Sequence, residues 1–131
     1  MSRLEKIKLE VFTDDRGVLV PLELKDFIDW EVKRIYFLPV LKGERGAHAV
    51  RGEKKIYICE KGTMEASFHD GKAWVDFELN GSGEAVVMEG FYYRKFFNFS
   101  DDAVLLAVSS LNYNRDDYVF DLDEFIKEAN K

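Results

Sequence analysis

The chain has 131 residues, of which 47% are hydrophobic and 15% aromatic, and its formal net charge is −6. This length suits one domain whose core needs no disulfide or metal, and the acidic balance argues against nucleic-acid binding, which requires a basic surface. No apolar run approaches the ~18 residues of a membrane span and the first twenty residues lack the apolar stretch of a secretory signal, so we expect a cytoplasmic protein without membrane contact.

The first half of the chain predicts short strands joined by turns, because short apolar runs alternate with glycines. Residues 7–11 alternate apolar and charged side chains, which indicates a strand with one solvated face. Residues 14–17 read Asp-Asp-Arg-Gly and predict a turn, since aspartate bonds its own backbone and glycine accepts a positive φ. Residues 18–23 return as the second strand of this hairpin, and a short helical turn over residues 24–28 precedes a strand over residues 33–38.

Further strands are predicted over residues 47–51, 55–59, 63–68, 73–79, 85–88, 92–99 and 104–109. The sequence His-Asp-Gly-Lys at residues 69–72 is typical of a hairpin turn, so we expect His69 to be an exposed turn residue. Cys59 is the single cysteine and lies in an apolar run, so we expect a buried free thiol.

A helix is predicted at the end of the chain. Asp121 can cap it, Glu124 occupies its third position, and apolar residues that follow share one face. About ten short antiparallel strands leave exposed edges unless the sheet closes or doubles. We therefore predict one all-β domain over residues 1–131, a small barrel or jelly roll with a short C-terminal helix.

His48 is the first candidate functional residue. The chain has only two histidines, which excludes a histidine-rich metal site. His48 lies between Ala47 and Ala49, with Gly46 and Arg51 close by, and these small neighbours leave room for a ligand. The residues alone leave open whether His48 is structural or a functional base.

Basic residues form two clusters in the sequence: Arg45, Arg51, Lys54, Lys55, Arg94 and Lys95. Guanidinium groups bind phosphates through paired hydrogen bonds. Lys54 is expected on a solvated strand face, so Lys55 points to the opposite face, into the barrel, where a lysine would need an anion. Arg94 stands among aromatic residues that could stack on a planar or sugar ligand. No phosphate-binding loop, dinucleotide fingerprint or nucleophile elbow is present.

Five stretches carry a family resemblance: DDRGVLVPLE, VKRIYFLP, GERGAHAVRGEKKIYICEKGT, FHDG and NFSDDAVLLAVSSLNYNRDDYVFDLDEF. Together they resemble the sugar 3,4-ketoisomerases of the WxcM-like cupin family, over residues 7–125. The most specific match is the family's RGxHAHK motif at residues 45–51, followed by Cys59 and Gly62. The resemblance implies a cupin-type jelly roll (double-stranded β-helix), a homodimer, no metal or other cofactor, and a dTDP-4-keto-6-deoxyglucose whose ketone moves from C4 to C3.

The resemblance also implies roles by position. His48 matches the first motif histidine and is expected to be the base of an enediol mechanism, with Tyr36 as its acid or oxygen partner. The implied substrate-binding residues are Arg16, Arg45, Arg51, Lys55 and Arg94. The positions of Arg16 and Arg94 are implied to influence the gluco or galacto configuration of the product at C4.

Two departures from the motif leave the function open. The second motif histidine is Val50, which can neither transfer a proton nor hydrogen-bond, and the family's usual glutamine is Lys55. The sequence therefore favours a nucleotide-sugar ketoisomerase, with a non-catalytic cupin that binds a sugar nucleotide or related ligand as the alternative. A metal-dependent cupin oxygenase or isomerase is a third hypothesis, disfavoured because Val50 breaks the HxH pair that it needs.

Overall fold

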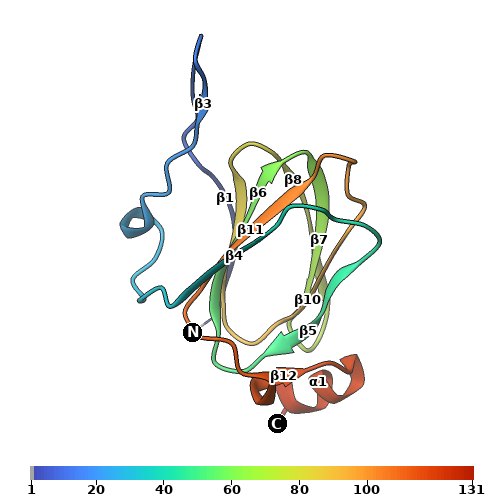
Figure 1. Ribbon diagram of the computed structural model, residues 1–131. Coiled ribbons are helices and arrows are strands. Elements are labelled where there is room, and N and C mark those ends of the chain that lie inside the picture. Colours follow the sequence, from blue (N-terminus) through green and yellow to red (C-terminus); the bar gives the residue numbers. More distant parts are fainter. Residues whose placement is uncertain (1) are drawn as a thin grey trace.

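Two five-stranded antiparallel sheets face each other in the computed structural model, which describes residues 2–131 (Figure 1). The first sheet runs in the order β1 (Arg3–Lys8), β9 (Glu84–Glu89), β6 (Lys54–Lys61), β11 (Val104–Ser109) and β4 (Arg34–Leu38). The second runs in the order β12 (Tyr118–Val119), β5 (Arg45–Val50), β10 (Tyr93–Phe97), β7 (Thr63–His69) and β8 (Trp74–Asn80). The jelly roll predicted from the sequence is confirmed.

Strand β6 shows why the first sheet is covered on both faces. Tyr57 and Cys59 point into the core between the sheets, where Tyr57 packs on Phe96 of β10 with ring centroids 4.6 Å apart. Ile56 and Ile58 point outward into a second apolar cluster, which the segment between residues 20 and 32 covers. This segment includes the 3-10 turn η1 (Leu24–Asp26), where the sequence predicts a helical turn. The predicted burial of Cys59 is confirmed.

The hairpin of β2 (Phe12–Asp14) and β3 (Gly17–Leu19) projects from the barrel, at the blue end of the chain in Figure 1. Its turn forms as predicted: the Arg16 backbone N–H donates to Asp14 Oδ1 at 2.8 Å, and Gly17 has a φ of +135°. All six residues of the two strands are exposed.

The end of the chain packs beneath the second sheet. A 3-10 turn, η2 (Arg115–Asp117), leads into β12, and helix α1 (Leu122–Ala129) follows. Asp121 caps α1 as predicted, with its Oδ1 accepting from the Glu124 N–H at 3.1 Å. No helix in the described part of the chain is long and apolar enough to cross a membrane.

Two local predictions are wrong. His69 is only 6% exposed, because its Nδ1 accepts from the Gly71 N–H at 2.9 Å and its ring packs edge-on against Trp74 and Phe125. The helix therefore covers the turn that the sequence predicts to be exposed. The predicted hairpin of residues 7–11 and 18–23 does not form, because the first strand covers Arg3–Lys8 and pairs with β9, while β3 ends at Leu19 and pairs with β2.

Candidate functional site

One cavity, of about 560 Å³, opens between β4, β5 and the segment that leads into β12; we call it the site cavity. Its lining consists of Arg34, Tyr36, Phe37, Leu38, Glu44, Arg45, Gly46, His48, Tyr113, Arg115, Tyr118 and Phe120. A smaller hollow of about 60 Å³ shares His48 and Tyr36 with it and reaches the core rings of Tyr57 and Phe96. The site cavity therefore joins the mouth of the barrel to its interior.

A bulge in β5 positions His48. Arg94 pairs with His48 and Lys95 pairs with Gly46, so Ala47 is the extra residue on β5. Gly46 and Ala47 both have positive φ, +88° and +56°. A Cβ at residue 46 would lie 2.9 Å from the Arg94 carbonyl oxygen, so only glycine allows the two strands to approach this closely.

The hydrogen bond of His48 fixes its tautomer. Its Nδ1 lies 2.9 Å from the Gly46 carbonyl oxygen, which can only accept, so Nδ1 carries the proton and Nε2 keeps a free lone pair. Burial, reinforced by the charge of Arg94, lowers the pKa of His48 to about 4. The imidazole is therefore neutral at pH 7, which is the form that a general base needs.

Tyr36 supplies a hydroxyl to the same cavity. Its side chain points inward from β4, between the inward-facing Arg34 and Leu38, while the alternate residues of the strand are exposed. The guanidinium carbon of Arg34 lies 4.5 Å from the Tyr36 ring centroid, and Lys55 Nζ lies 4.7 Å from it. Burial raises the pKa of Tyr36 to about 12, so its hydroxyl remains a hydrogen-bond donor across the neutral range.

The rest of the lining combines three arginines, Arg34, Arg45 and Arg115, with aromatic rings. Tyr118 stacks on Phe120 with centroids 5.6 Å apart and lies 4.9 Å from the His48 ring. Guanidinium groups bind phosphate oxygens, and aromatic faces pack on planar or sugar rings. This chemistry suits an anionic ligand that also carries rings.

The sequence analysis missed the contribution of the C-terminal segment. Tyr118 pairs with Val50 in the β12–β5 ladder, and this pairing brings residues 113–120 to the cavity. The aromatic and basic stretch NYNRDDYVF could have indicated a ligand-binding segment, but it entered the sequence analysis only as part of the family resemblance.

A buried charged cluster lies behind the cavity, formed by Glu53, Lys55 and Arg94, which are 3%, 0% and 1% exposed. Lys55 Nζ lies 3.3 Å from Glu53 Oε2, and Arg94 Nη2 donates to Glu53 Oε1. The hydroxyl of Ser109 also donates to Glu53 Oε2, at 2.9 Å. Lys55 thus points into the barrel, as its alternation with Lys54 predicts, and Glu53 is the anion that it meets.

The structure brings together three of the seven predicted site residues, His48, Tyr36 and Arg45, in the cavity lining. Lys55 and Arg94 are buried behind this lining. Arg51 lies outside it, since its guanidinium binds Glu128 of α1 at 2.6 and 2.9 Å.

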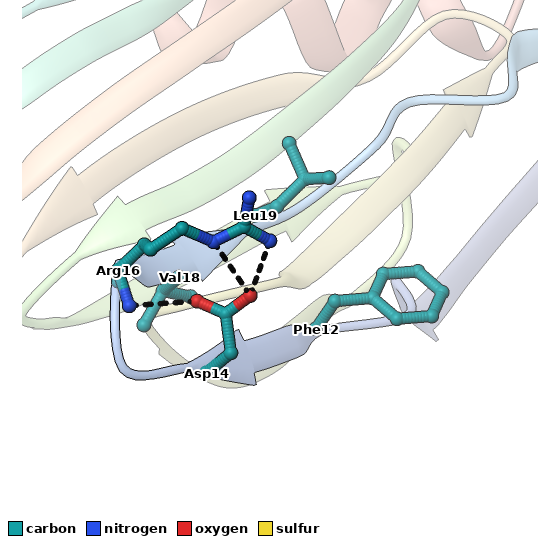
Figure 2. Close-up of a pocket in the computed structure, with 6 residues that line it drawn as sticks. Phe12, Asp14, Arg16, Val18 and Leu19 are labelled. Atoms are coloured by element: carbon teal, nitrogen blue, oxygen red, sulfur yellow. Dashed lines mark hydrogen bonds and ion pairs between the residues drawn. The ribbon is translucent and has the colours of Figure 1, made fainter.

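Arg16 lies on the projecting hairpin, bound to Asp14 through its side chain (Figure 2). A second hollow, of about 500 Å³, is lined by Phe12, Asp14, Arg16, Gly17, Val18 and Leu19, all from this hairpin. Within one chain, Arg16 and His48 therefore belong to different hollows.

The residues that the structure describes include no group of three or more His, Cys, Asp or Glu side chains arranged to hold a metal ion. In this part of the chain, Glu44 is the one carboxylate in the cavity lining, and Glu53, behind the lining, is engaged by Lys55 and Arg94.

Comparison with known proteins gives a consistent result. A curated protein from Aneurinibacillus thermoaerophilus, TDP-4-oxo-6-deoxy-alpha-D-glucose-3,4-oxoisomerase, is 28% identical over 123 residues, 92% of this chain and 88% of that protein. The crystal structure of a 3,4-ketoisomerase from Helicobacter canadensis superposes with a TM-score of 0.90 at 32% identity and covers 98% of both chains.

The sugar 3,4-ketoisomerase QdtA from Thermoanaerobacterium thermosaccharolyticum, in complex with TDP, has a TM-score of 0.88 at 27% identity, over 97% of this chain and 94% of that one. A histidine-to-asparagine variant of QdtA has been solved in complex with TDP-4-keto-6-deoxyglucose and matches equally well, at 26% identity. The sequence of the present protein matches the family described as FdtA, WxcM-like, C-terminal, over residues 2–130. The chain therefore belongs to the WxcM-like, C-terminal family and has its cupin-type jelly-roll fold.

Proposed function

We propose that the protein is a nucleotide-sugar isomerase that moves the keto group between C4 and C3 of a dTDP-4-keto-6-deoxyhexose. The observation that carries this proposal is the pairing of a neutral imidazole, His48, with a protonated hydroxyl, Tyr36, in one cavity. The similarity to proteins named as TDP-sugar 3,4-ketoisomerases supports the same reaction.

The chemistry needs one base and one oxygen partner. Nε2 of His48 removes the proton from C3, the C3–H electrons form a C3=C4 double bond, and the C4 oxygen takes a proton to give an enediol. The C3 hydroxyl then loses its proton as the C3 carbonyl forms, and C4 receives a proton from the imidazolium of His48, which returns the base to its neutral form. Tyr36 donates a hydrogen bond to the oxygen that becomes electron-rich. C3 is oxidised as C4 is reduced within the same sugar, so no external oxidant is required.

The ligand is a nucleoside diphosphate sugar. Arg34, Arg45 and Arg115 carry the charge that a diphosphate needs. The rings of Tyr113, Tyr118 and Phe120 offer apolar faces to the base or to the sugars. A product of this kind belongs to deoxysugar biosynthesis.

The protein acts as a homodimer in this proposal. The projecting hairpin exposes Phe12, Val18 and Leu19 by 49%, 59% and 65%, and a lone two-stranded hairpin is only marginally stable in water. Edge strand β4 also exposes apolar side chains, Ile35 by 60% and Phe37 by 65%. A second copy that covers these surfaces could place its Arg16 near the site cavity of the first.

A second candidate function, sugar-nucleotide binding without catalysis, is favoured by Val50. This residue stands at the position of the second motif histidine, and its buried aliphatic side chain can neither give nor take a proton. The two functions share the ligand and differ only in proton transfer.

The deciding experiment follows solvent deuterium into the sugar of dTDP-4-keto-6-deoxyglucose by mass spectrometry and NMR. We expect the protein to incorporate deuterium and form the 3-keto isomer, and His48→Asn to abolish both while TDP still raises its thermal midpoint. Binding by the unmodified protein without any exchange would replace the isomerase with the non-catalytic function.

A further inference from the structure

The buried cluster behind the site cavity holds two cations and one carboxylate. Among residues 2–131, Glu53 is the carboxylate that forms an ion pair with Lys55, and it also forms one with Arg94. Each side chain is at least 97% buried, since Lys55, Arg94 and Glu53 are 0%, 1% and 3% exposed. With both cations protonated, the cluster carries one positive charge in excess of its carboxylate.

Lys55 is the cation that Glu53 does not need. Arg94 and Ser109 already donate hydrogen bonds to the two carboxylate oxygens of Glu53, one to each. The contact of Lys55 is a longer ion pair, 3.3 Å to Glu53 Oε2. An unbalanced buried charge destabilises the folded state, so packing and stability give no reason to keep a lysine here. A group that destabilises the fold near a cavity is a candidate for a functional role.

The surplus charge lies against the proposed reacting groups. Lys55 Nζ is 4.7 Å from the Tyr36 ring centroid and 5.2 Å from that of Tyr57, and both rings line the smaller hollow that joins the site cavity to the core. Arg94 stands opposite His48 in the β5–β10 ladder. A positive charge at this place opposes protonation of the imidazole and attracts negative charge that develops on an oxygen beside Tyr36.

We propose that Lys55 is a positioning residue of the isomerisation, a surplus buried cation that acts through Tyr36 and His48 to stabilise the electron-rich enediol. The proposal rests on the ketoisomerase function proposed above. Lys55 touches no substrate atom in it and supplies the field in which the two catalytic side chains work.

The groups that face Lys55 define its electrostatic surroundings. They are Glu53 from the turn before β6, Arg94 from β10, Tyr36 and Arg34 from β4, Tyr57 from β6 and His48 from β5. Burial, together with Arg94, lowers the pKa of Lys55 to about 7, so the cluster carries its surplus charge below pH 7 and loses it at higher pH.

Lys55→Met tests the proposal, with Lys54→Met as the matched control because Lys54 is the exposed neighbour on the same strand. At about pH 6, where Lys55 is charged, we expect Lys55→Met to lower the turnover number for deuterium exchange about tenfold with KM unchanged. We also expect its thermal midpoint to rise by about 3 °C, because the remaining Glu53–Arg94 pair is balanced. Glu53→Gln, which leaves two cations without a carboxylate, should lower the midpoint instead.

A second readout does not depend on turnover. The protein has two histidines, so the imidazole signals can be followed by NMR and assigned with His48→Asn. Lys55→Met should raise the pKa of His48 by about half a unit, and Lys54→Met should leave it unchanged.

Each outcome bears on a separate claim. Unchanged exchange in Lys55→Met, or a thermal midpoint lowered as in Glu53→Gln, would overturn the positioning role and make Lys55 structural. Absence of exchange in the unmodified protein would instead remove the ketoisomerase function. In that case the pKa of His48 still tests the electrostatic action of Lys55. A raised pKa of His48 in Lys55→Met would support this action, and an unchanged pKa would overturn it.

Discussion

His48 and Arg94 stand directly opposite each other in the β5–β10 ladder, one at the cavity and the other buried behind it. Opposed side chains in an antiparallel pair lie on one face of the sheet, with Cβ atoms about 5 Å apart. The guanidinium therefore acts on the imidazole at short range, and the bulge at Ala47 sets this alignment.

The first prediction concerns the acid limb of activity. Because the pKa of His48 is lowered to about 4, the proposed base stays unprotonated at pH values where an ordinary histidine would be half protonated. We expect kcat/KM for isomerisation to remain high at pH 5.5 and to halve near pH 4, provided that circular dichroism shows the fold intact. A midpoint near pH 6.5 would contradict the assigned environment.

The second prediction concerns Tyr36. Tyr36→Phe removes the hydroxyl and keeps the ring that contacts Arg34 and Lys55. We expect turnover to fall about 100-fold, because the developing oxyanion loses its donor. Calorimetric titration with TDP should give an affinity within about threefold of the unmodified protein. Wild-type turnover in this variant would remove Tyr36 from the mechanism.

The third prediction concerns stability and pH. The pKa of Lys55 is about 7 in the folded protein and near 10.5 in the unfolded chain, so between these values the unfolded chain holds more protons. The free energy of unfolding therefore rises with pH across this window. Urea titrations should show a gain of about 2 kcal/mol for the unmodified protein between pH 7 and 9, relative to Lys55→Met. If the free energy of unfolding changes with pH in the same way for both proteins, the pKa of Lys55 is not lowered by folding.

The fourth prediction tests the proposed homodimer through a site shared between its two copies. If Arg16 acts in the partner's cavity, Arg16→Ala and His48→Asn are each inactive alone, yet a mixed dimer contains one site with both native residues. Mixing the two variants by refolding should restore about a quarter of native activity, the fraction expected for a symmetric dimer. The double variant Arg16→Ala/His48→Asn mixed with Arg16→Ala serves as the control. A mixed dimer without recovered activity would place Arg16 outside the partner's site.

The sequence predicts the sheet architecture well, because alternation and glycine spacing report local backbone preferences. It also predicts that Lys55 points inward, because side chains alternate along a strand. The predicted exposure of His69 is wrong because burial there depends on a distant part of the chain. The turn forms as its sequence predicts, but Phe125 of the C-terminal helix packs against the His69 ring.

The ion pairs around the site could not be predicted from the sequence, because they join residues that are far apart in the chain. Glu53 had no distinguishing pattern, and only the fold brings it to Arg94, 41 residues later. Arg51 sits inside the motif, yet Glu128 of α1 holds it away from the cavity.

The position of the aromatic side chains in the site cavity depends on helix α1, which is not part of the cavity lining. Phe125 of α1 is fully buried against Phe91 and Tyr93, and the Tyr93 hydroxyl donates to the Phe120 carbonyl oxygen at 3.2 Å. Because β12 connects this anchored helix to the cavity wall, we expect local opening of the C-terminus to displace Tyr118 and Phe120 from the cavity while the barrel stays folded. Occupancy of the cavity should consequently slow amide hydrogen exchange in α1, a helix that contributes no residue to the cavity lining.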